Sequence, residues 1–402
     1  MDIQGKRVAV VVAGAGARGG YEAGALSVLV PRLRAAGYEP TVYIGTSAGA
    51  INVTLFAAFA DLPAAEQADR VLALWRRISV ADIYRSPILT FPCIATQVLG
   101  QFLRVPGVRF THLLDTAPLK KMAEHSIDID RLHDNIREKG LTVAVVATSG
   151  CDNRSVVFVD RRDGVPVPAS DQERPIDYVG VEMGPEHVLA SSAIPALFPA
   201  VPVEKPSGST DWFLDGGLRL NAPLKPALSL DADALVVVAT HPMRDPPTTP
   251  EAGALPPDVD EILVQFLDIV LVDRMVEDLR TLDKINALVR TEEPVVTASG
   301  RLRKKVPYVF VGPERRETLG HLAIDILHRH RRHSGDLLHR LRQLELDVMG
   351  HLLQGDGPRR GDLMSFLYFD QEFITASIEL GQRDANEAFK GVPANEVPWC
   401  SN

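Results

Sequence analysis

One serine of this chain lies in a pattern that is typical of a nucleophile. Ser47 is the centre of a Gly-x-Ser-x-Gly pentapeptide that is bounded by Gly45 and Gly49. The extended apolar run 41–44 precedes the pentapeptide, and the helix-like run 50–60 follows it. A serine on a sharp turn between a strand and a helix presents its hydroxyl beside backbone N–H groups that can stabilise negative charge. The pattern predicts a catalytic Ser47, and a strand-to-helix turn without chemistry is the alternative interpretation.

A nucleophilic serine needs a base, and Asp215 is the candidate that we prefer. It ends an extended run, and two glycines that leave space around its carboxylate follow it, Gly216 and Gly217. A carboxylate can accept the proton directly when its surroundings raise its pKa. A plain turn is the alternative interpretation of the Asp-Gly-Gly triplet. Several histidines also follow Ser47 in the chain, and of these His187 fits either a core or a catalytic role.

A glycine-rich turn between the first predicted strand and the first helix has two interpretations. Its six residues are Gly14, Ala15, Gly16, Ala17, Arg18 and Gly19. This spacing matches the dinucleotide-binding fingerprint, which also requires an acidic residue at the end of the second strand. Glu39 has the required distance but precedes that strand, whereas Ser47 follows it. We therefore prefer an oxyanion hole, in which backbone N–H groups of the turn face Ser47 across one edge of a parallel sheet.

The composition indicates a globular enzyme and disfavours a nucleic-acid partner. The chain has 402 residues, of which 46% are hydrophobic and 24% charged, and its net charge is -9. An acidic balance disfavours both nucleic-acid binding and permanent electrostatic anchoring to anionic lipids. The three cysteines are few and scattered, which favours a reducing compartment. Because we find neither a signal peptide nor an apolar window of about 20 residues, we expect a cytoplasmic protein, and peripheral contact with membranes stays open.

Strands that alternate with helices predict an α/β fold with a mainly parallel central sheet, flanked by helices in three layers. Apolar runs predict strands at 8–12, 141–147, 155–160, 234–240 and 308–311. Helical patterns lie at 21–36, 66–78 and 259–290, and the chain beyond residue 314 looks purely helical apart from a break at 355–361. We expect an α/β domain over residues 1–314 and a helical C-terminal region over residues 315–402 that packs on the same domain.

The order of these motifs resembles the patatin-like phospholipases. That family combines a glycine-rich oxyanion loop, a Gly-x-Ser-x-Gly turn and a later Asp-Gly-Gly or Asp-Gly-Ala triplet. The segment 190–199 is similar to the family's Ser-x-Ala-x-Pro-x-x-Phe-Pro block, and the segment 221–223 is similar to its Asn-x-Pro continuation. The resemblance covers residues 8–239, and residues 380–385 look similar to the end of several bacterial members. Four motifs in the family's order make the resemblance specific.

The resemblance implies a lipid acyl hydrolase with a patatin-like fold. It assigns the nucleophile to Ser47 and the base to Asp215, a Ser-Asp dyad without a histidine, and the oxyanion hole to the Gly14–Gly19 loop. The substrate would be a phospholipid or another fatty-acyl ester, which reacts through an acyl-enzyme. This chemistry needs no metal and no cofactor. A transient contact with a membrane surface would accompany such a substrate.

One departure from the family pattern leaves an alternative open. The family loop usually has glycine where this chain has Ala15, so the loop must take a conformation that alanine accepts. If it does not, the chain could be a weak or inactive patatin-like protein that binds lipid. We expect Arg18 to shape the loop through backbone carbonyls rather than face solvent. The apolar run 88–103 could form an acyl tunnel, a lid or core, and the C-terminal helices could form a dimer contact or an inhibitory cap.

Overall fold

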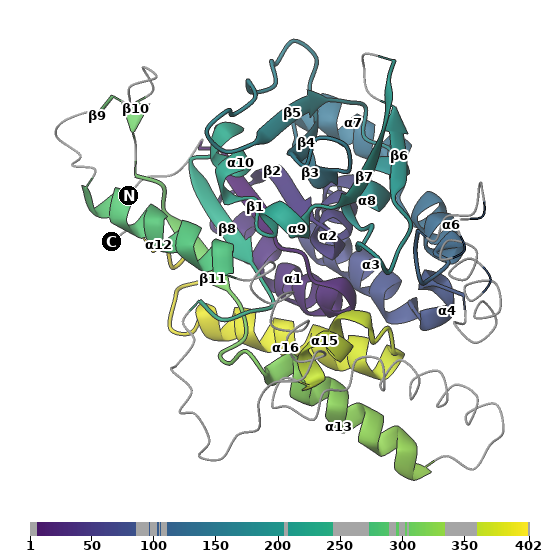
Figure 1. Ribbon diagram of the computed structural model, residues 1–402. Coiled ribbons are helices and arrows are strands. Elements are labelled where there is room, and N and C mark those ends of the chain that lie inside the picture. The colour runs from purple at the N-terminus through teal and green to yellow at the C-terminus, as the bar shows by residue number, and fades with distance from the viewer. Residues whose placement is uncertain are drawn as a thin grey trace, which may run out of the picture.

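The structure is a computed structural model of the chain (Figure 1). It describes residues 6–85, 111–204, 208–243, 273–288, 305–333 and 360–400, the pairs 295–296 and 302–303, and residues 96, 103 and 105. The apolar run 88–103 therefore lies outside the described residues except at 96 and 103, as do residues 259–272 of the long helical pattern.

Within the described residues, nine strands form one sheet. Its main path runs in the order β11-β8-β1-β2-β3-β4-β5, and β7 pairs with both β3 and β6. The first five strands of this path run parallel to one another, whereas β3 pairs antiparallel with β4 and with β7. The strand bounds are β1 Val8–Val12, β2 Pro40–Thr46, β3 Thr142–Ser149, β4 Ser155–Arg161, β5 Ile176–Gly180, β6 Val201–Glu204, β7 Thr210–Asp215, β8 Ala234–Val238 and β11 Tyr308–Val311. The mostly parallel sheet expected from the sequence is confirmed.

Helices cover both faces of the sheet and produce the three expected layers (Figure 1). Alternate residues of β1 pack into two separate cores, because successive side chains of a strand point to opposite faces. One core packs against α1 Gly19–Ala35, α2 Ala48–Ala58, α3 Ala64–Arg77, α4 Val80–Ile83, α6 Ala117–Ser126, α7 Ile129–Lys139, α8 Pro185–Ser191, α13 Thr318–His333 and α16 Gln371–Ala388. The other packs against α9 Gly217–Leu220, α10 Leu224–Ser229 and α12 Asp273–Leu288. The remaining elements are the turn η1 Gly16–Arg18, α15 Arg360–Leu367, and the separate strand pair β9 Val295–Val296 and β10 Leu302–Arg303.

The strand register brings the glycine-rich turn, Ser47 and Asp215 to one edge of the sheet. Val12 at the end of β1 pairs with Gly45 near the end of the parallel strand β2. The glycine-rich turn and Ser47 therefore leave the sheet side by side, as the sequence predicts. The antiparallel strand β7 reaches the same edge from the other direction, because its last residue, Asp215, pairs with Ala147 of β3.

Some elements differ from those predicted from the sequence. Strands β5 and β6 were not predicted, because each is short and alternates buried with partly or fully exposed side chains. Helix α1 begins at Gly19 rather than at residue 21; its first two residues are glycines, which have a low helix propensity and did not suggest a helix start. The chain after residue 314 is not purely helical, because Cys400 forms an antiparallel bridge with Tyr308. No helix within the described residues has the length and apolar character needed to cross a lipid bilayer.

The C-terminal helix α16 packs closely against α1 (Figure 1). The Tyr21 hydroxyl donates a 3.0 Å hydrogen bond to Asp384, and the Gln382 side chain donates one of 3.1 Å to Ser27. The helices meet at Gly381, where a Cβ atom would overlap the Tyr21 carbonyl oxygen. The C-terminal region thus lies on the helical layer of the α/β sheet, and the domain boundary at residue 314 stays a prediction.

This close approach makes the effect of an alanine at position 381 predictable. Replacing a glycine inside a helix by alanine ordinarily stabilises it by about 0.5–1 kcal/mol. We expect Gly381→Ala to destabilise the protein instead, by about 1–3 kcal/mol, because the added methyl group forces the two helices apart. Urea denaturation measures this difference, and Glu379→Ala, at an exposed position of the same helix, is the matched control. A Gly381→Ala protein that is more stable than wild type would contradict the packing described.

Candidate active site

Ser47 lies on the sharp turn between β2 and α2, and its backbone is strained. Its φ of 55° and ψ of -127° place it in a region that side-chain-bearing residues rarely occupy. The Ser47 N–H donates a 2.9 Å hydrogen bond to the Ser191 hydroxyl, which in turn donates one of 2.6 Å to the Val146 carbonyl. A Cβ at Gly49 would overlap the Ala13 carbonyl, so a glycine allows the turn to pack against the end of β1. This is the geometry of a nucleophile elbow.

Asp215 lies beside Ser47 and is held in place by its own backbone. Its N–H donates a 2.8 Å hydrogen bond to the Ala193 carbonyl, and its carbonyl accepts one of 3.0 Å from the Thr148 hydroxyl. The Gly217 N–H donates a 2.7 Å hydrogen bond to the carboxylate. The Ser47 side chain lies close enough to the same carboxylate to lower its pKa. The structure therefore brings together the serine and the aspartate that the sequence singled out.

The surroundings of Asp215 raise its affinity for a proton. Burial raises the pKa of its carboxyl from the ordinary 3.8 to about 6, because a low-dielectric environment disfavours the charged form. The Ser47 side chain and the hydrogen bond from Gly217 act in the opposite direction and lower this pKa, but they do not outweigh the burial. A carboxylate with a pKa near 6 can accept a proton near neutral pH better than an ordinary aspartate can.

The glycine-rich turn faces Ser47, with a conformation that accepts the alanine of this chain. A Cβ built at Gly14 would lie 3.2 Å from the Ser47 Cβ. Ala15 has a φ of -142°, and the positive φ of the turn, 56°, falls on Gly16. The expectation that the turn adopts a conformation open to alanine is confirmed. Ala15, which stands where the family usually has glycine, is therefore not strained by a left-handed backbone conformation.

Not every N–H group of this turn can serve as an oxyanion donor. The Gly14 N–H donates to both the backbone carbonyl and the side-chain oxygen of Asn221, at 3.1 and 3.0 Å. The N–H groups of Arg18 and Gly19 donate back into the turn, to Ala15 and Gly16. Among the turn's N–H groups, those of Ala15, Gly16 and Ala17 have no acceptor among the described residues. Gly14 is therefore a structural residue of the loop, which corrects its assignment as a donor.

Two supporting residues were present in recognised motifs, but their roles were not predicted. Ser191, in the segment 190–199, accepts the Ser47 N–H, and Asn221 holds the Gly14 N–H. Neither role shows in the spacing of the motif, because each depends on a contact between segments more than a hundred residues apart. Arg18 is fully buried, which excludes the solvent-exposed alternative.

The structure does not fit a catalytic role for His187 or a ribose-binding role for Glu39. His187 accepts a 3.0 Å hydrogen bond from the Gly184 N–H and packs edge-on against Phe158, so it is a core residue. Glu39 precedes β2, at the sheet edge opposite the glycine-rich turn, and pairs with Arg34 at 2.8 Å. It cannot receive the ribose of a dinucleotide bound at that turn. Within the described ranges, no group of three or more His, Cys, Asp or Glu side chains is placed to hold a metal ion.

A small apolar cavity opens beside the Ser47 side chain. Its volume is about 30 Å³, room for about one water molecule. Its lining combines Gly16, Ser47, Ala48 and Ser192 with nine larger apolar side chains, Ile51, Trp75, Ile78, Ile83, Leu119, Met122, Ile194, Phe198 and Phe369. The site can therefore receive an apolar group next to the serine, provided that some of these side chains move.

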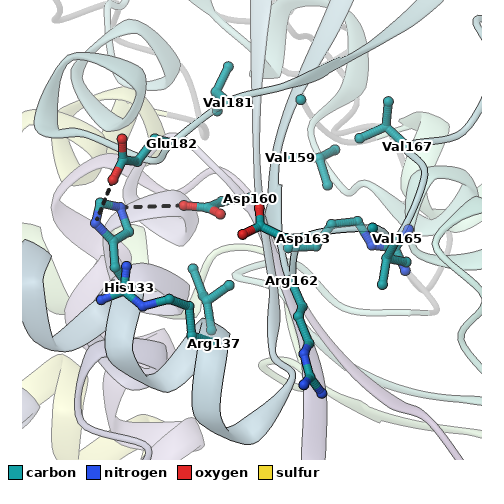
Figure 2. A pocket seen from close by; sticks show the side chains of 14 residues that line it. His133, Arg137, Val159, Asp160, Arg162, Asp163, Val165, Val167, Val181 and Glu182 are labelled. Atoms are coloured by element: carbon teal, nitrogen blue, oxygen red, sulfur yellow. Dashed lines mark ion pairs between the residues drawn. The ribbon is translucent and has the colours of Figure 1, made fainter.

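A larger groove lies at the opposite edge of the sheet, where β4 and β5 end, and has a different character (Figure 2). Its volume is about 580 Å³, and charged side chains of both signs line it. His133 points between Asp160 and Glu182, at 3.4 Å from each, and lies 3.1 Å from the Met183 carbonyl oxygen. Arg161 at the end of β4 pairs with Thr142 at the start of β3, whereas Asp215 pairs with Ala147 near the end of β3. This groove is therefore separate from the Ser47 site.

The raised pKa of Asp215 predicts a cost in stability with a definite dependence on pH. The folded-state pKa lies above the unfolded value, so the ionised carboxylate destabilises the fold as pH rises from about 4 through about 6. Each pKa unit is worth about 1.4 kcal/mol, so we expect Asp215→Asn to be more stable than wild type by up to about 3 kcal/mol at pH 8.

Urea denaturation between about pH 4.5 and pH 8 tests this prediction, because the difference should grow through this range. Asp61→Asn is a control of opposite sign, since Arg131 lowers the pKa of Asp61 to about 2 and its charge stabilises the fold at neutral pH. A difference between wild type and Asp215→Asn that does not vary with pH would contradict the burial of an ionisable Asp215.

Comparisons with known proteins show the family of the chain. The model of the patatin-like phospholipase family matches residues 10–228, more than half of the chain. No curated protein matches the chain. Among solved structures, the chain is similar to VipD from Legionella pneumophila, with 12% sequence identity and a TM-score of 0.31, over 96% of this chain and 86% of that one. The family match includes the glycine-rich turn, the serine elbow and the Asp-Gly-Gly triplet, and the chain belongs to the patatin-like phospholipase family.

Proposed function

We propose that this protein hydrolyses fatty-acyl esters such as phospholipids, with Ser47 as nucleophile and Asp215 as base. One observation carries the proposal: the Ser47 side chain lies against the buried Asp215 carboxylate, and burial raises the pKa of that carboxyl to about 6. The pair is a nucleophile with an adjacent base, and the base is itself oriented by the Gly217 N–H. Membership of a phospholipase family supports a lipid acyl ester as the substrate class.

The proposed reaction has two steps. Asp215 accepts the hydroxyl proton of Ser47 while the serine oxygen attacks the ester carbonyl, and the alcohol leaves with a proton from Asp215. Asp215 then takes a proton from a water molecule as that water attacks the acyl-enzyme, and it returns the proton to Ser47 Oγ as the intermediate collapses and releases the fatty acid. The backbone N–H groups of Ala15 and Gly16, at the start of the turn η1, stabilise the oxyanion of both tetrahedral intermediates. The negative φ of Ala15 supports a catalytic rather than a purely lipid-binding role.

The cavity beside Ser47 supports an apolar acyl group rather than a polar one. Its larger lining side chains are aliphatic or aromatic. An acyl chain exceeds a volume of about 30 Å³, so its entry requires side chains of the lining to move. Contact of this edge with a membrane surface follows from a phospholipid substrate and is part of the proposal.

The proposal predicts a single reactive serine. Treatment with a fluorophosphonate should add one label to the wild-type protein, as intact mass shows, and the wild type should hydrolyse p-nitrophenyl butyrate. Both should be lost in Ser47→Ala. Ser377→Ala is the matched control, because this serine is also buried but lies in α16 and does not line the cavity. It should keep both the label and the turnover.

A variant of Asp215 tests its proposed role as the base. We expect Asp215→Asn to reduce the rate of hydrolysis by about 10²–10⁴, the range of general base catalysis. Asp160→Asn removes a carboxyl whose pKa burial also raises, but at the opposite edge of the sheet, and should leave the rate unchanged. A folded wild type with neither label nor turnover would contradict the hydrolase proposal and favour a lipid-binding protein. A label on another serine would contradict the assignment to Ser47.

A further inference from the structure

Arg18 ends the turn that carries the proposed oxyanion donors, and its side chain is completely buried. A buried guanidinium is costly unless hydrogen bonds and stacked groups replace its water. An arginine in this place therefore needs partners with defined positions. Those partners decide how rigidly the turn is held.

Three of its partners come from parts of the chain beyond the matched family region, residues 10–228. The Arg18 Nε donates a 2.7 Å hydrogen bond to the Ser365 hydroxyl of α15. The guanidinium carbon lies 4.1 Å from the centre of the Phe366 ring, a cation–π contact. Nη1 lies 3.4 Å from Nε2 of His241, a residue that follows β8.

The histidine is suited to accept this hydrogen bond. Burial, and after it the charges of Arg18 and Arg316, lower the pKa of His241 well below its ordinary value. A neutral imidazole offers one nitrogen as an acceptor. The ring also stacks against Phe366, at 6.1 Å between centres and 26° between planes. Phe366 and His241 thus form two walls of one pocket for the guanidinium.

Helix α15 contacts the backbone of the turn as well as its arginine. A Cβ at Gly16 would overlap the Phe366 carbonyl oxygen, so the two backbones are in van der Waals contact. Phe369, three residues further on, lines the cavity beside Ser47. Helix α15 therefore touches both the arginine and the backbone of the turn, and the segment that follows α15 reaches the cavity beside Ser47.

We propose that Ser365 and Phe366 are positioning residues for the oxyanion hole. They hold the guanidinium of Arg18, and through it they fix the direction of the Ala15 and Gly16 N–H groups. Oxyanion donors contribute to the rate only when they are aimed in advance at the position of the developing charge. Helix α15 is thus part of the proposed catalytic unit, although the family motifs end far before it. This inference rests on the hydrolase proposed above.

The proposal is tested with a soluble ester, p-nitrophenyl butyrate, and the full-length protein. We expect Ser365→Ala and Phe366→Leu to lower kcat by about 10- to 100-fold with little change in KM. Removal of an oxyanion donor lowers kcat by about 10²–10³, and a donor that is present but wrongly oriented should lower kcat by less. Ser365→Thr keeps the hydroxyl and should restore most of kcat. Ser377→Ala and Phe373→Leu, which change buried residues of the same types in α16, are the matched controls and should retain kcat.

A double-mutant cycle shows whether Ser365 acts through the arginine. Arg18→Lys removes the guanidinium, so Ser365→Ala should have little further effect on kcat in that background. Thermal unfolding of each variant identifies those that fail to fold. If Phe366→Leu is unfolded, the kcat of Ser365→Ala, the smallest change, still tests the proposal.

The outcomes separate the two proposals. An active wild type with folded Ser365→Ala and Ser365→Thr variants of unchanged kcat would overturn the positioning role and leave the hydrolase intact. Equal losses of kcat in Ser365→Ala and in the α16 controls would also overturn it, because the effect would then be general destabilisation. An inactive, unlabelled wild type would overturn the hydrolase, and the positioning role would fall with it.

Discussion

The parallel register of β1 and β2, with β7 antiparallel against β3, is the constraint on which the candidate site depends. Val12 opposite Gly45 puts the glycine-rich turn beside Ser47, and Ala147 opposite Asp215 brings the carboxylate to the same edge. The strands that precede the turn and the serine are buried, so the sheet rather than a mobile loop sets the distances between the groups. Preorganisation of this kind is what the proposed reaction requires.

The same edge gathers groups that are unfavourable to bury. Asp215 is ionisable in a dry environment, Arg18 carries a charge beneath the turn, and Ser47 occupies a strained backbone conformation. Each is compensated locally: Gly217 donates to the carboxylate, α15 and His241 surround the guanidinium, and Ser191 holds the serine backbone. In the proposed enzyme, stability is thus exchanged for reactivity at one place.

The sequence was sufficient for those parts of the site that short segments encode. Ser47 and the glycine-rich turn each follow a parallel strand within a few residues, so local pattern and strand order predicted both their types and their common edge. Asp215 was predicted from its Asp-Gly-Gly triplet and from the family resemblance, but its place at the same edge depends on the antiparallel strand β7 and was not predicted. Local pattern could not show that Asn221 occupies the Gly14 N–H, or that Ser365 lies against Arg18, because these contacts join segments more than 200 residues apart. Strands β5 and β6 escaped prediction for a different reason, since short edge strands with partly exposed residues lack a continuous apolar run.

The central claim is that a single carboxylate, Asp215, activates Ser47 without a histidine. The most direct measurement is the rate constant for fluorophosphonate labelling of Ser47 as a function of pH. The account predicts a rate that rises with pH through one inflection near 6, the pKa that burial gives to Asp215, and that loses this inflection in Asp215→Asn. An inflection that persists in Asp215→Asn, or a rate that is independent of pH between about 5 and 8, would contradict the claim.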